Sequence, residues 1–484
     1  MKLFLFLDDW FIDAKCDVDR VYPPAKLEKV FDWYSPDSDA THFNVTNKLY
    51  EAWAGPGPYE EWTTTVPDDM YLVTSEDGEN WTGKREAGKV TLIGDPPPGK
   101  PLRMTELPDR RDKDRWHGLE FDDRWDPDPD RRYKCIVWPF ARHISAIGEI
   151  EGGVGLVACS PDGIHWTADM RHQWFGRPNG ADTCNNIIYN PIIKKWQVIC
   201  RPWNLDRRVA MVESEDLEHW TDPRVIVHPE ETDGPCMQFY GMPALVYEDE
   251  YLFGAVNYYR TPVAEGGEAL AFADQGTAKW LGTVDVKLAY SYDGQSWWRP
   301  DRRHVLIPRG DPGTYLGGAM YCKTIDVDKD GTINFFSKGY TVNHGVAPDG
   351  YPRNVRTLVR HSLRHDGFCY LEATGWGRFS TRPLWLNDGE LTLNYNAGGV
   401  GCVRVQASDI DRKPIAGYTF DDCIPLEGDE IYGAVRWRDG KNLADFVGKE
   451  KIRLDFLFMD ARIYAFRIDC GLWYTYTPEP IERI

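Results

Sequence analysis

The sequence predicts an all-β protein, with a five-bladed β-propeller over residues 1–373 and a C-terminal β-sandwich over residues 374–484. Three observations predict this fold. A short turn motif recurs along the first part of the chain, its copies lie about 72 residues apart on average, and short alternating strands without the motif fill the remainder. Helices are not expected, because Pro and Gly are dense and long stretches of 3.6-residue periodicity are missing.

The turn motif reads S-x-D-G-x-x-W in its clearest form. It begins at Ser75 (SEDGENW), Ser160 (SPDGIHW), Ser214 (SEDLEHW) and Ser291 (SYDGQSW). Each copy follows an apolar, β-prone run, which is typical of a hairpin with a tight turn. Asp and Gly tolerate the positive φ of such turns, and Ser and Asp side chains can bond nearby backbone N–H groups. We expect the Trp to lie on the return strand and to pack against a neighbouring sheet.

The number of hairpins predicts the number of blades. A weaker relative of the motif, HSLRHDGFCYLEA, places Asp366 and Gly367 in the same setting, so five hairpins predict five blades between roughly Thr41 and Ala373. From Thr374 onward, ELTLNYNAG, GCVRVQAS, KIRLDFLF and RIYAFRI are short alternating strands. They predict a separate sandwich of about 110 residues.

Net charge, hydropathy and cysteine spacing indicate which kinds of binding partner and cellular compartment to expect. The formal net charge is −20 and the sequence pI is about 5.0, so the chain repels phosphate backbones and nucleic acid is not an expected partner. No apolar run is long enough to cross a bilayer, and Asp8 and Asp9 end the apolar opening too soon for a secretory signal. The 11 cysteines lie without close pairs, as expected of reduced thiols. We therefore expect a cytoplasmic protein without a membrane partner, for which a homo-oligomer stays open.

Aromatic residues make up 13% of the chain, including 20 Trp and 25 Tyr. Flat apolar rings match the C–H faces of pyranoses and furanoses, so this content suits a small carbohydrate as partner. An aromatic β core explains any single Trp equally well.

On these residues the chain resembles the five-bladed glycosidases of glycoside hydrolase families 32, 43 and 68. The resemblance rests on the S-x-D-G-x-x-W hairpins and the strands after them, and it covers nearly the whole chain in architecture. It implies a propeller, a C-terminal sandwich and hydrolysis of glycosidic bonds. The N-D-P-N-G, R-D-P and Glu-Cys signatures of family 32 are absent, so no catalytic residue is transferred by motif.

Candidate catalytic residues follow from the fold instead. The first strand of each blade lines the channel of a propeller, and glycoside hydrolysis usually needs two carboxyl groups beside the scissile bond. Glu120, in RWHGLEFDD, is the candidate general acid, since burial between apolar neighbours would raise its pKa. Asp182 and Asp233 precede the next two apolar strands and are the candidate nucleophile or base and its pKa-modulating partner. Each of the three could instead be a strand-end, capping or turn residue.

Candidate substrate-binding residues lie close to these strands. Two tryptophans could stack on a sugar ring, and four polar residues after inner-strand runs could hydrogen-bond its hydroxyl groups. They are Trp116, Trp203, Arg201, Tyr258, Arg260 and His344. A structural role is open for each of them.

No cofactor is expected, and no metal site is assigned. DVDKDG at Asp326–Gly331 matches half of an EF-hand loop, but a hairpin turn fits it better because position twelve is Ser337. The aspartates of FDDRWDPDPDRR could hold a structural calcium ion, or could pair with the arginines of their own loop. Zinc, P-loop, dinucleotide and serine-hydrolase motifs are missing.

The leading hypothesis is a glycoside hydrolase that cleaves small furanosides, of fructosyl or arabinosyl type. One alternative is a non-catalytic propeller that binds carbohydrate or protein, since a propeller alone does not define function. Another is a glycoside phosphorylase, which would need an Arg- or His-rich pocket. The only adjacent pair near an inner strand in the sequence is Arg142 with His143.

Overall fold

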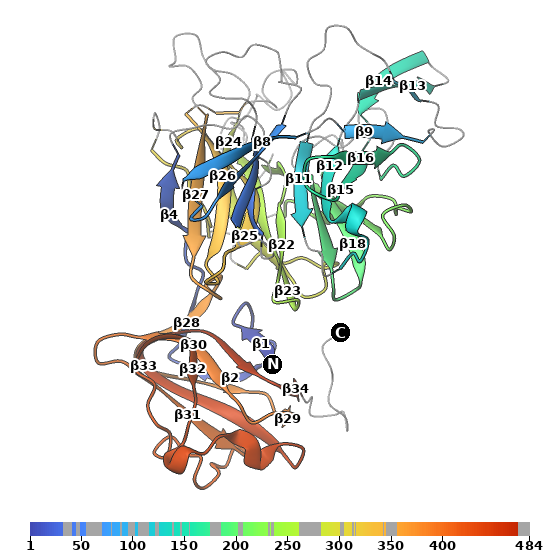
Figure 1. Cartoon of the computed structure of the whole chain (residues 1–484). Coiled ribbons are helices and arrows are strands. Elements are labelled where there is room, and N and C mark those ends of the chain that lie inside the picture. Colours follow the sequence, from blue (N-terminus) through green and yellow to red (C-terminus); the bar gives the residue numbers. More distant parts are fainter. Residues whose placement is uncertain are drawn as a thin grey trace. The chain divides into compact units, whose positions relative to one another are not determined.

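The computed structural model describes residues 1–31, 41–54, 70–104, 116–174, 185–201, 207–260, 282–344 and 356–472, apart from short breaks within these ranges. The described chain is nearly all β (Figure 1). Its short 3-10 helices include η1 (Pro129–Arg131), η5 (Arg438–Gly440) and η6 (Leu443–Phe446). Residues 24–362 form one compact unit, called unit 2, and residues 1–23 with 363–484 form the other, called unit 1.

Unit 2 is built mainly from antiparallel sheets in which strands that are consecutive in sequence are mostly hydrogen-bonded neighbours. The first sheet contains β5 (Thr41–Asn44), β6 (Leu49–Ala54), β7 (Met70–Ser75) and β8 (Trp81–Ala87). The second contains β11 (Trp116–Phe121), β12 (Tyr133–Val137), β15 (Leu156–Ser160) and β16 (Trp166–Asp169), with β9 (Val90–Ile93) parallel to β16. A small sheet joins β10 (Leu102–Met104), β13 (Phe140–Ser145) and β14 (Gly148–Gly153). The next sheet contains β17 (Asn186–Asn190), β18 (Lys195–Cys200), β19 (Val209–Ser214) and β20 (Arg224–Val227).

The remaining strands of unit 2 form two antiparallel groups. One contains β21 (Met237–Phe239), β22 (Ala244–Tyr247), β23 (Tyr251–Arg260) and β24 (Thr283–Ser291). The other contains β25 (Ala319–Val327), β26 (Ile333–Tyr340), β27 (Arg356–Leu363) and β4 (Lys26–Val30). A single parallel pair, Val284 with Ala319, links the groups into one hydrogen-bonded sheet. The side chain of Asn257 adds two further bonds, because its Nδ2 donates to the Cys322 carbonyl oxygen at 3.0 Å and its Oδ1 accepts from the Cys322 N–H at 2.8 Å.

The four clear copies of the turn motif occupy one register position. Each motif serine ends the third strand of its sheet and pairs with a second-strand residue, which in turn pairs with a first-strand residue. The sets are Ser75–Tyr50–Phe43, Ser160–Tyr133–Phe121, Ser214–Trp196–Tyr189 and Ser291–Leu252–Val246. The motif therefore marks the same end of each sheet, which we call the turn end.

The second motif shows why these residues recur. The Ser160 hydroxyl accepts a hydrogen bond from the backbone N–H of Gly163 at 2.9 Å and donates to Asp162 at 3.1 Å. Gly163 has a φ of 74°, and the indole of Trp166 donates to its carbonyl oxygen at 3.1 Å. Trp166 is only 1% exposed. The predicted hairpin turn and its buried return-strand Trp are thus confirmed for this copy.

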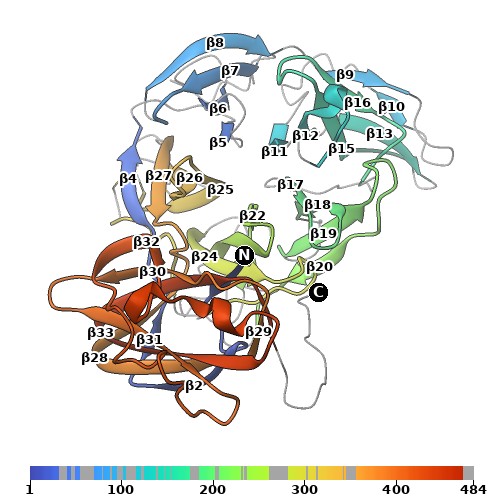
Figure 2. The ribbon, with the colours of Figure 1, turned by 60° about the horizontal axis from the view of Figure 1, so that its bottom comes forward.

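The first strands of the sheets are neighbours in space. In Figure 2, β5, β11, β17, β22 and β25 lie innermost. Strand β17 lies beside both β11 and β22, and β25 lies beside both β22 and β5. A side-chain bond joins two of these strands, because the Ala244 N–H donates to Asn186 Oδ1 at 3.1 Å.

The predicted fifth hairpin is wrong in one respect. Asp366 does adopt a positive φ of 59°, but the chain then enters the sheet of unit 1 instead of returning beside β27. The strand that pairs with β27 is β4, from the N-terminal part of the chain. Asp366 is fully buried, and its carboxylate accepts two hydrogen bonds of 2.8 Å from Arg467. An internal ion pair, rather than a blade hairpin, accounts for the Asp-Gly pair here.

Unit 1 is a sheet organised on one 18-residue strand, β33 (Lys451–Ile468). Its other strands are β1 (Lys2–Leu5), β2 (Ile12–Cys16), β3 (Asp19–Val21), β28 (Tyr370–Thr381), β29 (Leu384–Leu386), β30 (Thr392–Ala397), β31 (Cys402–Ser408), β32 (Gly428–Ala434) and β34 (Cys470–Leu472). Stacked rings fill its core, with centroids of Phe4 and Phe466 4.6 Å apart and those of Phe379 and Phe456 4.4 Å apart.

The division into units differs from the predicted one. The prediction assigned residues 1–23 to the propeller, but β1 pairs with β33, and β2 and β3 pair with β28. The boundary falls at residues 362 and 363 instead of 373 and 374, because β28 already belongs to unit 1. The apolar opening of the chain is therefore core: Leu3, Phe4 and Leu5 are at most 3% exposed.

Over the described residues, no helix has the length and apolar character required to span a membrane. Cys135, Cys200, Cys369 and Cys423 are buried thiols that form no disulfide. Burial raises the pKa of Cys200 to about 12, so this thiol stays protonated and unreactive at neutral pH.

Candidate functional site

The first strands β17, β22 and β25 start at one end of unit 2, which we call the leading end. The start of β17 pairs with the end of β18, and the start of β25 pairs with the end of β26. A backbone bridge between Gly282 and His344 joins the segment before β24 to the segment after β26 at the same level. The S-x-D-G turns lie at the opposite end of these sheets, so the two ends are chemically distinct.

Asp233 lies at the leading end and is held by several donors. Arg299 Nη1 and Nη2 donate to its two carboxylate oxygens at 2.7 and 2.6 Å. The Glu230 N–H donates at 2.8 Å, and the Tyr258 hydroxyl donates at 3.2 Å. The Asp233 side chain is 0% exposed and that of Arg299 is 6% exposed. Burial favours the neutral acid, but these hydrogen bonds outweigh it and lower the pKa of Asp233.

This geometry restricts what Asp233 can do. A carboxylate whose lone pairs are directed at four donors is a weak base and a poor nucleophile. It can, however, orient Tyr258 and Arg299 and place a fixed negative charge beside them. The arrangement therefore fits the predicted role of a modulating partner better than that of the attacking group.

Lys287 and Tyr258 extend the Asp233 group. The Lys287 ammonium lies 3.9 Å from the centre of the Tyr258 ring, a cation–π contact, and Lys287 is 6% exposed. Burial lowers the pKa of Lys287, whereas burial and the nearby Asp233 raise the pKa of Tyr258 to about 12. Tyr258 is thus a neutral hydroxyl at physiological pH and acts as a donor to Asp233.

A second group, which we call the aromatic–arginine cluster, forms at the leading end around Tyr240. Arg201 lies over the Tyr240 ring at 4.2 Å, and Arg207 lies 5.5 Å from the same ring and 4.7 Å from that of Tyr259. The His344 ring packs edge-on against Tyr240 at 5.0 Å. The cluster consists of Arg201, Arg207, Tyr240, Tyr259, Tyr321 and His344. Tyr240, Arg207 and His344 are half-buried, so the cluster reaches the surface through them.

Strand β23 separates the two groups. Successive residues of a strand point to opposite faces, so Tyr258 and Tyr259 face different neighbours. Tyr258 belongs to the hydrophobic cluster that includes Ile199 of β18, whereas Tyr259 belongs to the cluster that includes Ala319 of β25. The structure thus brings Asp233 together with Tyr258, and Arg201 together with His344, but not all four in one contact group.

The positions of Trp116 and Glu120 are given by backbone register. Counted back from the motif serines, Trp116 lies at the level of Cys200, directly before Arg201, and therefore at the leading end. Glu120 lies at the level of Ile188, nearer the turn end. Glu120 lies near the end of β11, whereas Asp233 precedes the start of β21, so the two carboxyl groups occupy different levels along their strands.

The other predicted residues divide into two sets. Asp182 and Trp203 lie outside the described residues. Arg260 is the last residue of β23 and is half-buried. Its positive charge lies close enough to Tyr258 to lower the pKa of that hydroxyl, against the larger effect of burial.

Sequence reasoning missed Arg207, Tyr240, Arg299 and Lys287. Arg207 and Tyr240 lie in connecting segments, and Arg299 follows the fourth turn motif by two residues. Lys287 lies within the apolar run VKLAY and was not considered as a site residue. A lysine inside a buried strand nevertheless indicates that its charge is paired or has a function, because lysine is seldom buried otherwise. The others carry no local signal, because only the packing of sheets brings them together.

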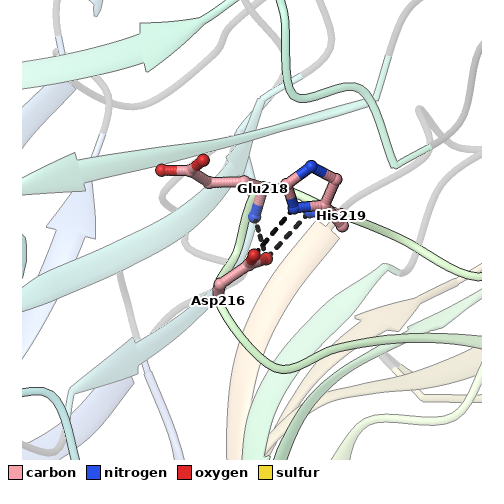
Figure 3. A group of neighbouring side chains, drawn as sticks. All are labelled: Asp216, Glu218 and His219. Carbon is pink, nitrogen blue, oxygen red and sulfur yellow. Dashed lines mark hydrogen bonds and ion pairs between the residues drawn. The ribbon is translucent and has the colours of Figure 1, made fainter.

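Within the described part of the chain, one group of side chains has spacing suitable for a metal ion, and it belongs to a turn motif. Asp216, Glu218 and His219 lie close together and are all exposed (Figure 3). Asp216 already accepts from the N–H groups of Glu218 and His219, both at 2.8 Å, and contacts the His219 ring at 2.7 Å. Asp162 and His165 repeat this geometry in another copy. The group is the architecture of the turn, and we assign no metal to it.

The two aspartate-rich stretches that were compared with calcium loops in the sequence also have internal partners. Asp126 lies 3.0 Å from Lys134 and 3.2 Å from Arg131, and Asp128 caps η1. Asp328 lies in the turn between β25 and β26, where Gly331 has a φ of 84°. These contacts fit the alternative of an ion-paired loop and a hairpin turn.

No protein-family model matches the chain, and no curated protein matches it. Solved structures do, at low identity. An N-acetylgalactosamine deacetylase from F. plautii, in complex with blood group B trisaccharide, is 11% identical with a TM-score of 0.43, covering 74% of this chain and 96% of its own. A thermostable family-43 glycoside hydrolase is 12% identical with a TM-score of 0.42, covering 70% and 92%. The GH32 β-fructofuranosidase of Bombyx mori is 12% identical with a TM-score of 0.36, covering 93% and 94%.

The chain is thus similar to structures from families 43 and 32, in agreement with the resemblance seen in its turn motifs. With TM-scores below 0.5, no activity follows for this chain from these structures.

Proposed function

We propose that the chain is a glycoside hydrolase acting on small carbohydrates at the leading end of unit 2. The observation that carries the proposal is that two groups of buried and half-buried polar and aromatic side chains, the Asp233 group and the aromatic–arginine cluster, lie at this one end. Aromatic faces suit the C–H surface of a sugar ring, and guanidinium and phenol groups suit its hydroxyls.

The proposal extends to architecture. The sheets that begin with β5, β11, β17, β21–β22 and β25 would be the five blades of a propeller, with β4 completing the last blade. Unit 1 would correspond to the C-terminal sandwich, completed by three N-terminal strands. In this arrangement the leading end is the mouth of the central channel.

The catalytic roles follow from the chemistry of the three predicted carboxyl groups. Asp182 lies three positions before Asn185 in the segment that enters β17, and we assign it the nucleophile or base. Asp233, bound by Arg299, is assigned the modulating role. Glu120, on β11, is assigned the general acid, and the kcat of Glu120→Gln tests this role.

The substrate would be a small furanoside, of fructosyl or arabinosyl type. The test is release of sugar from nitrophenyl furanosides and pyranosides and from short fructo- and arabino-oligosaccharides, with and without inorganic phosphate. Turnover in water supports the hydrolase, and strict dependence on phosphate supports a phosphorylase instead. Binding without turnover of any substrate, unchanged in carboxylate variants, points to a non-catalytic propeller.

A further inference from the structure

One face of the unit 1 sheet is exposed over part of its length and carries apolar side chains there. Strands β28, β33 and β31 lie side by side (Figure 2). Residues directly opposite in neighbouring strands share a face, so the backbone register sorts the side chains into two faces. One face contains Phe379, Phe456 and Val405, a paired row that is at most 1% exposed. The opposite face, which we call the outer face, contains Trp376, and this side chain is 51% exposed.

The apolar residues of the outer face are contiguous. Trp376 pairs with Met459, and Met459 pairs with Cys402 on its other side. Leu457 lies two positions before Met459 on the same face, and Val400, which is 82% exposed, precedes Cys402 by two positions. Single apolar residues are common on protein surfaces, whereas a contiguous apolar patch usually marks a binding surface. We call these five residues the outer patch.

Two arginines border the outer patch. Arg378 and Arg404 lie on either side of Leu457, one row along the strands from Trp376. Residues two positions apart in a strand are about 7 Å apart, so the Arg378 side chain starts close to the indole. Arg378 is exposed, whereas Arg404 is half-buried and donates through Nη1 to the Phe420 carbonyl oxygen at 3.0 Å. This bond holds the Arg404 guanidinium in place at the border.

Carboxylates lie further along the same face and at its rim. Asp455, in the third row, accepts from the hydroxyl groups of Ser380 and Ser408 and from Gln406 Nε2, the last at 3.3 Å. Asp460 is exposed and directly follows the outer patch along β33. The rows of the outer face thus change from apolar through cationic to hydrogen-bonded polar groups.

The size of the outer patch favours a small ligand over a protein surface. A stable protein interface buries about 800 Å² on each partner. A whole tryptophan buries about 150–250 Å², so the half of Trp376 that is exposed offers on the order of 100 Å². An area of this size matches a sugar ring, whose flat C–H face stacks on an indole while its hydroxyl groups bond to guanidinium groups and carboxylates.

We infer that the outer patch and its two bordering arginines form a carbohydrate-binding surface on unit 1. Trp376 stacks on one ring of an oligosaccharide, and Arg378 and Arg404 donate hydrogen bonds to hydroxyl groups of this ring or the next. The surface goes beyond the proposed hydrolase, because it consists of unit 1 residues and uses none of the candidate catalytic carboxyl groups. It holds a glycan chain without cleaving it.

Calorimetric titration of the full chain with defined oligosaccharides tests this surface. The probes are cellohexaose, xylohexaose, maltohexaose, arabinohexaose and nystose, titrated into the wild type and into an Asp182→Asn background in which cleavage should not consume them. We expect at least one probe to bind, and Trp376→Ala to weaken that binding by about tenfold or more. Trp376→Phe keeps an aromatic face and should retain part of the affinity. Arg378→Gln should weaken binding less than Trp376→Ala does.

The matched control is Trp298→Ala. Trp298 is exposed to a similar extent, 46%, but belongs to unit 2, so its replacement should leave probe binding at the wild-type level. Circular dichroism and thermal denaturation verify that each variant is folded, which the exposure of both tryptophans leads us to expect. The inference is overturned if no probe binds, or if Trp376→Ala binds the probes as tightly as the wild type does.

The readouts also separate this inference from the proposed function. Probe binding that depends on Trp376, without release of sugar from any substrate, supports the surface and not the hydrolase. Release of sugar, together with probe binding that Trp376→Ala does not change, supports the hydrolase and removes the surface.

Discussion

Arg299 binds both carboxylate oxygens of Asp233, at 2.7 and 2.6 Å, with the two side chains withdrawn almost completely from solvent. This pair fixes one side of the leading end, because Tyr258 is bonded to the same carboxylate. Arg299 follows the fourth turn motif closely in sequence, so the pair also ties that hairpin's return segment to the segment before β21.

Breaking the pair should cost stability. Replacing Asp233 with Asn leaves the buried Arg299 charge with only the half-exposed Glu230 carboxylate, 3.8 Å away, as its counter-ion. The loss of a buried partner typically costs about 3 kcal/mol in the free energy of unfolding. Urea denaturation of wild type and Asp233→Asn measures the loss. Asp169→Asn is the control: its partner Arg171 is 61% exposed, so we expect a loss below about 1 kcal/mol. Equal effects of the two substitutions would contradict a special role for the buried pair.

The same pair gives a pH dependence with a definite sign. The folded pKa of Asp233 is below its ordinary value of 3.8, so the folded state binds fewer protons on this group than the unfolded state. Its contribution is therefore complete above pH 3.8 and is lost as the pH falls below that value. The difference in stability between wild type and Asp233→Asn should shrink in that acid range, and a difference that stays constant would argue against ionisation of Asp233 in the folded protein.

Asp328 should give the opposite pH dependence. Burial and the neighbouring Asp330 raise the pKa of Asp328 to about 6, and the Tyr50 hydroxyl donates to Asp328 at 3.2 Å. A raised carboxyl pKa stabilises the folded state below pH 3.8, and this stabilisation is lost as the pH rises through 6. After allowance for solvent screening at this half-buried site, we expect a loss of about 1 kcal/mol between pH 4 and pH 7.5. Asp328→Asn should remove this slope in urea titrations; an unchanged slope would assign the effect to other groups.

The motif tryptophans should matter for folding and not for chemistry. Trp166 is 1% exposed, and Trp166→Ala should lower the free energy of unfolding by about 3–5 kcal/mol through cavity formation. Trp298→Ala is the matched control, since Trp298 is 46% exposed and should cost much less. Turnover per folded molecule should be unchanged in both variants. A selective loss of turnover in Trp166→Ala would place the turn motif in the site.

Removal of the proposed catalytic carboxylates should abolish turnover without unfolding the chain. We expect Asp182→Asn and Glu120→Gln each to lower kcat by about a thousandfold or more, the scale of a lost nucleophile or general acid. Asp249→Asn is a suitable control, because its φ of 59° is one that Asn adopts readily. If Glu120→Gln turns over as the wild type does, the acid must be sought among carboxyl groups at the leading end.

Local chemistry explains what the sequence predicted well. The S-x-D-G turn is determined by a few neighbouring residues, so its hairpins could be predicted without knowledge of the fold. The copy at Asp366 shows the limit of this reasoning. Its positive φ is as expected, but Arg467, 101 positions away, decides which sheet the chain enters next.

The site was predicted less completely for the same reason. Asp233 and Tyr258 are 25 positions apart and could be proposed together from their strands, and the structure joins them. Arg299 lies 66 positions from Asp233, and the contact of Arg201 with Tyr240 crosses between sheets. Neither contact follows from strand periodicity, because it depends on how one sheet packs on the next.

The pairing of β4 with β27 bears on how this protein is made. The Ser362 hydroxyl donates to Glu28 at 2.7 Å across a sequence separation of 334 positions. At translation rates of about 5–20 residues per second, the interval between synthesis of β4 and synthesis of β27 is on the order of half a minute. During that interval β4 has no partner strand on the nascent chain. Its charged residues Lys26, Glu28 and Lys29 are of the kind that disfavour pairing of an exposed strand with another nascent chain on the same messenger RNA.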